Sequence, residues 1–109
     1  MIQPEDVLRH YVQRHNQGVT RGNFEGLMEM FRDDAVLEIQ GRRSWSGKAA
    51  IERAFREQPP TDELVALSFR FQPPGTLEAD YAWKRTPSQR AGSLRFEIVD
   101  ASIARLQIT

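Results

Sequence analysis

Apolar and weakly polar residues near the start of the chain recur every three or four positions, which is typical of one buried helix face. This stripe consists of Val7, Leu8, Tyr11, Val12, His15 and Val19. Pro4 suits a first helical turn, and the acidic side chains of Glu5 and Asp6 suit the positive end of the helix dipole. The pattern predicts a helix over Pro4–Thr20 that ends before Gly22.

Two shorter helices and one strand are predicted in the next forty or so residues. Asn23 can cap a helix over residues 24–32, whose apolar stripe is Phe24, Leu27, Met28 and Phe31. The partly β-branched run Ala35–Ile39 ends at a turn and predicts a strand. A third helix is expected over Lys48–Glu57, because Gly47 can open it and the two prolines at 59 and 60 prevent its continuation.

From residue 63 onward the apolar residues recur every second position, which indicates strands. Val65, Leu67, Phe69 and Phe71 form a first run, and Leu77, Ala79, Tyr81 and Trp83 form a second run after the turn at residues 73–75. A third run contains Leu94, Phe96 and Ile98, and a fourth covers Ile103–Thr109. Four consecutive strands of this kind predict an antiparallel meander.

The helices are therefore expected in the first half of the chain and most strands in the second half. Such segregation predicts the α+β class, with three helices packed on one face of a curved, cone-shaped antiparallel sheet. The sequence contains no internal repeat and no linker, so one core over residues 1–109 explains the whole chain.

Two segments of the sequence resemble a known family. The run Gly22–Glu38, with its Gly-Asn-Phe start and Phe-Arg-Asp-Asp-Ala-Val end, and the run Trp45–Ile51, with Gly-Lys before an isoleucine, are similar to SnoaL-like proteins and ketosteroid isomerases of the nuclear-transport-factor-two-like superfamily. The resemblance implies a cystatin-like α+β roll that encloses an apolar pocket. It also implies activities such as isomerisation and polyketide ring closure, although some members only bind ligands, so the fold does not settle the function.

The resemblance also locates the catalytic groups of a ketosteroid isomerase, which needs a carboxylate base and an oxyanion hole built from a tyrosine and a protonated acid. The base position falls at Ile39, the tyrosine position at about His15, and the late acid within residues 92–94, which contain no acid. The steroid isomerase acids are therefore not matched. Glu38 is the nearest carboxylate, but strand alternation turns it to the opposite face.

Tyr11 and His15 remain the candidate catalytic pair. They lie four residues apart on the apolar stripe of the predicted first helix, so both are expected to point between helix and sheet. In an enzyme, His15 would act as the acid or base and Tyr11 would orient it or the ligand. In a non-catalytic protein, the same residues would be satisfied components of the core.

Large apolar side chains are expected to surround this pair on the concave side of the sheet. They either fill the core or line a pocket for a small hydrophobic, cyclic ligand. The candidate lining residues are Met28, Phe31, Leu37, Ile39, Trp45, Phe55, Phe69, Phe71, Tyr81, Trp83 and Phe96.

Composition narrows the classes of partner. Fifteen basic and fifteen acidic residues balance to zero net charge, which argues against binding to nucleic acid or to an anionic membrane. No cysteine is present, and the two histidines lie on different helical faces, so no metal site is expected. The start of the sequence lacks a basic and apolar leader, so we expect a cytoplasmic protein.

Two function classes therefore remain. The first is an isomerase-like or cyclase-like enzyme that moves a proton without a cofactor, and the second is a non-catalytic ligand-binding or dimerisation module. The outer sheet face alternates acids and bases, and the resemblance implies a homodimer formed through this face.

Overall fold

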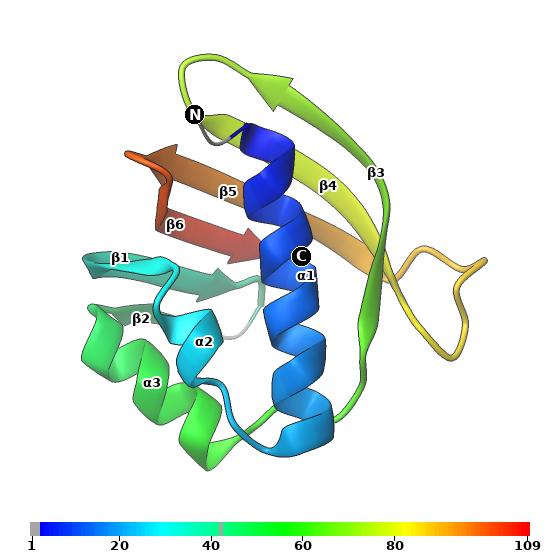
Figure 1. Cartoon of the computed structure of the whole chain (residues 1–109), viewed down its shortest axis with the longest axis horizontal. Coiled ribbons are helices and arrows are strands. Elements are labelled where there is room, and N and C mark those ends of the chain that lie inside the picture. Colours follow the sequence, from blue (N-terminus) through cyan, green and yellow to red (C-terminus); the bar gives the residue numbers. More distant parts are fainter. Residues whose placement is uncertain (1–2, 42) are drawn as a thin grey trace.

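The strands form one curved sheet that wraps around a long helix (Figure 1). The computed structural model describes residues 3–41 and 43–109. The helices are α1 (Pro4–Arg21), α2 (Glu25–Met28) and α3 (Lys48–Glu57). The strands are β1 (Phe31–Ile39), β2 (Arg43–Ser46), β3 (Leu64–Gln72), β4 (Thr76–Trp83), β5 (Gly92–Val99) and β6 (Ser102–Ile108).

The six strands have the spatial order β2-β1-β6-β5-β4-β3. Consecutive strands from β3 to β6 pair antiparallel, which confirms the predicted meander. β1 and β6, however, run parallel, so the expectation of a purely antiparallel sheet is wrong. Parallel pairing needs a long crossover between the two strands, and the chain between residues 39 and 102 supplies it. The α+β class, with a curved and unclosed sheet, is confirmed.

Helix α1 lies across the concave face of the sheet, as its stripe of apolar residues predicts (Figure 1). Its start is stabilised by Asp6, whose carboxylate accepts a hydrogen bond from the Gln3 N–H at 3.2 Å. Its end is set by Gly22, whose φ of 73° lies in the left-handed region that favours glycine.

Helix α2 is much shorter than expected. The prediction of a helix over residues 24–32 is wrong, because helix α2 ends at Met28 and strand β1 begins at Phe31. The Met30 carbonyl accepts a hydrogen bond from the Ile103 N–H at 2.8 Å, and Phe31 pairs with Ile103. Pairing within the sheet therefore overrides the local pattern of Phe31 and Arg32, which favours a helix. The neighbouring strand β2 was not predicted, because it has only four residues.

A bulge in β3 changes which of its residues face the core. The pairing with β4 shifts between Ala66 and Ser68, so Leu64, and not Val65, lies opposite Trp83 on the concave face. Leu64 is 3% exposed, and the expectation that Val65 leads the buried run is wrong. Beyond the bulge the predicted alternation returns, with Phe69 opposite Ala79 and Phe71 opposite Leu77.

Candidate functional site

The two candidate catalytic residues lie in the core under helix α1. Tyr11 is 1% exposed and His15 is 4% exposed, and their ring centroids are 6.1 Å apart. The Tyr11 ring packs edge-on against Phe96 of β5, with 5.2 Å between ring centroids. Both side chains therefore point inward, which is the orientation that their four-residue spacing predicts.

Burial shifts the titration of this pair. It raises the pKa of the Tyr11 hydroxyl far above its usual value, and the nearby Tyr81 adds to the effect. Burial also lowers the pKa of the His15 imidazole. The hydrogen bond with Asn16 and the charge of Glu63 act in the opposite direction and offset part of this decrease. At neutral pH Tyr11 is therefore a protonated phenol, and His15 is a neutral imidazole.

Asn16 fixes the orientation of His15. The Asn16 side chain clamps the start of β3, since its Nδ2 donates to the Leu64 carbonyl at 2.8 Å and its Oδ1 accepts from the Leu64 N–H at 2.9 Å. The same Oδ1 lies 3.1 Å from Nδ1 of His15. Because this oxygen only accepts, Nδ1 of the neutral ring must donate, which leaves Nε2 unprotonated and basic. Sequence reasoning missed Asn16, because its partner is distant in the chain.

A groove opens at the other side of α1, between the end of that helix and helices α2 and α3. It encloses about 940 Å³. The apolar part of its lining includes Phe24, Met28 and Phe55, and its rim carries the charged side chains of Glu25, Glu29, Lys48, Glu52 and Arg56. Neither Tyr11 nor His15 lines this groove. We call it the helix groove.

The ring of Phe24 separates the helix groove from His15. Its centroid lies 6.4 Å from that of His15 on one side and 5.3 Å from that of Phe55 on the other. Gly18 of α1 makes this position possible, because a Cβ atom there would overlap the Phe24 ring. The candidate base and the groove are thus one aromatic layer apart.

The predicted lining residues fall into three groups. Phe31, Leu37, Tyr81 and Phe96 are buried in the core, and Met28 and Phe55 also border the helix groove. Ile39, Trp45 and Trp83 are partly buried, and the two tryptophans pack against the core. Phe69 and Phe71 are exposed. The structure therefore divides these eleven residues between the core, partly buried positions and an exposed strand.

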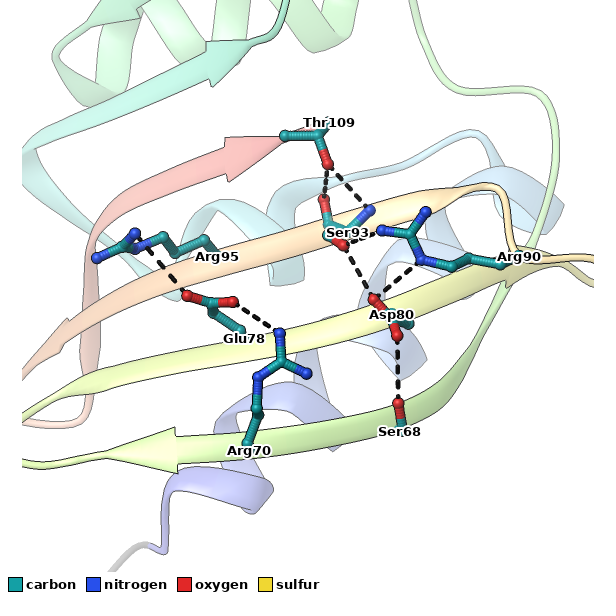
Figure 2. A network of polar contacts seen from close by, with 8 residues as sticks. All are labelled: Ser68, Arg70, Glu78, Asp80, Arg90, Ser93, Arg95 and Thr109. Atoms are coloured by element: carbon teal, nitrogen blue, oxygen red, sulfur yellow. Dashed lines mark hydrogen bonds and ion pairs between the residues drawn. The ribbon is translucent and has the colours of Figure 1, made fainter.

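The outer face of the sheet carries a polar network (Figure 2). Asp80 accepts from Ser93 at 2.9 Å and pairs with Arg90 at 3.1 Å, and these two hydrogen bonds hold the pKa of the Asp80 carboxyl below its usual range. Glu38 lies on the same face, where it pairs with Arg105 at 2.7 Å. The sequence correctly predicted that Glu38 lies on the face opposite the core.

A shallow hollow of about 770 Å³ lies on this outer face and includes Glu38, Glu78 and Arg95. Its carboxylates are already paired with arginines of the same sheet. Among residues 3–41 and 43–109, no three histidine or acidic side chains come together in a way that could hold a metal ion. No helix in this part of the chain is long and apolar enough to cross a membrane.

Comparisons with known proteins identify the fold. Neither a family model nor a curated protein matches the sequence. An NTF2-like protein of unknown function from Cytophaga hutchinsonii superposes with a TM-score of 0.74 over 100% of this chain and 90% of its own, at 11% identity. A candidate polyketide cyclase from Sinorhizobium meliloti superposes with a TM-score of 0.69 at 24% identity, over 99% of this chain and 100% of its own. A candidate ketosteroid isomerase from Kribbella flavida superposes with a TM-score of 0.70 at 19% identity, over 96% of this chain and 75% of its own. The chain therefore has the NTF2-like fold.

Proposed function

We propose that this chain, with its NTF2-like fold, binds a small, largely apolar, ring-containing molecule in the helix groove. The observation that carries the proposal is the composition of the groove, in which Phe24, Met28 and Phe55 offer apolar surface inside a charged rim. Ligand sites commonly combine an apolar lining with a few polar groups and enclose roughly 300–1,000 Å³. The candidate cyclase and isomerase of the same fold favour a cyclic ligand.

Binding to the protein in solution tests this function with 2-tetralone, a neutral bicyclic ketone. We expect saturable shifts of the backbone amide resonances of Phe24, Met28 and Phe55 in nuclear magnetic resonance spectra. Met28→Gln places a polar group of similar length in the groove and should weaken binding, whereas the matched change Phe69→Gln on β3 should not. Shifts confined to β3, or the absence of saturation, would refute the proposal.

A second candidate function is proton transfer by His15 without a cofactor. One observation favours it: the hydrogen bond with Asn16 leaves Nε2 of a neutral imidazole unprotonated, and only the Phe24 ring separates His15 from the groove. For this chemistry Phe24 must turn aside, so that a bound ketone reaches the His15 base and the Tyr11 phenol. The base would then remove a proton from the carbon next to the carbonyl.

Exchange of the α-hydrogens of 2-tetralone in heavy water tests this second function. A catalytic His15 predicts exchange faster than in buffer alone, lost in His15→Gln and accelerated in Phe24→Ala, which opens the wall. If 2-tetralone binds but exchanges no faster than in buffer, even with Phe24→Ala, the protein is a binding module and not a proton-transfer enzyme.

A further inference from the structure

Asn16 connects the candidate base to the start of β3. Its side-chain Nδ2 donates to the Leu64 carbonyl at 2.8 Å, and its Oδ1 accepts from the Leu64 N–H at 2.9 Å. The same Oδ1 lies 3.1 Å from Nδ1 of His15. The first residues of β3 lie beside the C-terminal half of α1, which carries both side chains (Figure 1). One amide group therefore holds a strand and a buried imidazole together.

The backbone of Leu64 sets the direction in which this amide points. A backbone N–H only donates and a backbone carbonyl only accepts, so Oδ1 must face the N–H of Leu64 and Nδ2 must face its carbonyl. A reversed amide would oppose donor to donor and acceptor to acceptor. Leu64 is 3% exposed, and buried backbone groups are rarely left without partners. The orientation of the Asn16 amide is therefore set by the fold, independently of His15.

The orientation of the amide in turn assigns the proton of the neutral His15 ring. The oxygen of Asn16 has no proton to give, so Nδ1 must donate, and the lone pair remains on Nε2. The two nitrogens of an imidazole point in nearly opposite directions, so Nε2 points away from the amide. The reversed amide would have the opposite effect, because its NH₂ group would donate to Nδ1 and the proton would move to Nε2. Only the observed orientation leaves Nε2 able to act as a base.

Other groups around the His15 ring act on it in other ways. The Tyr11 and Phe24 rings lie 6.1 Å and 6.4 Å away between centroids. Glu63, the residue before β3, acts through its negative charge, which favours the protonated ring. The Glu63 carboxylate is itself paired with Lys84 at 3.4 Å. The hydrogen bond with the amide is therefore the contact that fixes the ring proton.

An amide at position 16 also orients the ring without adding charge. A carboxylate there would accept from the Leu64 N–H and from His15, but its negative charge would favour the imidazolium, which has no lone pair to accept a proton. It would also leave the Leu64 carbonyl without its donor. With the neutral amide, burial holds the pKa of His15 below its usual value and keeps the base unprotonated at neutral pH.

We propose that Asn16 is a positioning residue that keeps Nε2 of His15 as the base of the site, an inference that rests on the proton-transfer function proposed above. Nε2 takes a proton from the carbon next to the carbonyl of the ligand, and the electron pair of the broken C–H bond moves to the carbonyl oxygen to form an enolate. The protonated ring exchanges its proton with solvent and, in heavy water, returns a deuteron to the carbon. Because Leu64 sets the amide, the base is available only while β3 is clamped to α1.

Nitrogen-15 chemical shifts of the His15 ring test the assignment in the wild-type chain without a ligand. The unprotonated nitrogen of a neutral imidazole resonates far downfield of the protonated one, and couplings to the ring hydrogens distinguish Nδ1 from Nε2. At neutral pH we expect Nε2 to be the unprotonated nitrogen. A protonated Nε2 overturns the proposal. This measurement needs no substitution, so it does not depend on whether a variant folds.

Asn16→Asp tests whether this positioning matters for proton transfer. The added charge should raise the midpoint of the His15 titration by about 1 pH unit or more, and the pH profile of α-hydrogen exchange in 2-tetralone should move up with it. Gln17→Glu is the matched control, because it adds a carboxylate at an exposed neighbouring position where water weakens its field. It should leave the titration and the exchange profile close to those of the wild type.

The outcomes separate a positioning role from a structural one. A structural Asn16 would lose stability in Asn16→Asp without moving the pH profile of exchange, and an unmoved profile overturns the proposal. A wild type with the expected ring shifts and no accelerated exchange refutes the proton-transfer function instead, and the assignment of the ring proton to Nδ1 then stands alone.

Discussion

Two parts of the concave face carry the same kind of side chain and have opposite environments. Under α1, Tyr11 and Phe96 contact one another and are almost fully buried. On β3, Phe69 and Phe71 belong to the same face but are 49% and 38% exposed. The alternation of a strand fixes which face a side chain occupies, whereas a covering element decides whether that face is buried.

The largest expected difference between the two parts follows from truncating Phe96. Phe96→Ala removes the ring that contacts Tyr11 and leaves a cavity in the core. It should lower the free energy of unfolding by about 3–5 kcal/mol, measured by urea denaturation. A loss below about 1 kcal/mol would mean that the core around α1 is loosely packed and that the comparison fails.

A smaller loss is expected where α1 is clamped to the start of β3. Asn16→Ala leaves the N–H and C=O of the buried Leu64 without their side-chain partners. The free energy of unfolding should fall by about 1–3 kcal/mol in the same measurement. Gln17→Ala, an exposed neighbour on the same helix, is the control and should have little effect.

The buried histidine should make stability depend on pH. Burial lowers the pKa of His15 in the folded chain below the value near 6.5 that it has when unfolded. Between these two values the unfolded chain binds a proton that the folded chain does not, so stability is fully present above pH 6.5 and falls as the pH decreases. Urea denaturation of His15→Gln should lack this decrease, whereas His10→Gln should retain it. An unchanged decrease in His15→Gln would contradict the assignment.

The smallest effect is expected on the exposed part. Phe69→Ala should change the free energy of unfolding by no more than about 0.5 kcal/mol when it is measured at a concentration where the chain is monomeric. A loss above about 1 kcal/mol in urea denaturation would mean that Phe69 is packed as the core residues are, and the comparison would fail.

Much of the fold could be predicted from local pattern. The long helix α1, the helix Lys48–Glu57 and the meander from β3 to β6 have strong periodicity and clear turn residues, and the structure confirms them. The failures occur where distant partners override local preference. Residues 29–32 have a helical pattern, yet the pairing of Phe31 with Ile103 draws them into the sheet.

The candidate site was harder to predict than the fold. Four-residue spacing correctly placed Tyr11 and His15 in the interior. It could not show that Phe24 would stand between His15 and the helix groove, because that contact depends on the missing side chain at Gly18. It also could not show that Phe69 and Phe71 would stay exposed, because the extent of α1 along the sheet is a property of the assembled fold.

The place of β6 in the sheet constrains how this protein is made. β6 lies between β1 and β5, so it joins a half built from β1 and β2 to a half built from β3, β4 and β5. Neither half can complete its hydrogen bonds while residues 102–108 are still inside the ribosome. The complete sheet can therefore form only after this strand has left the ribosome.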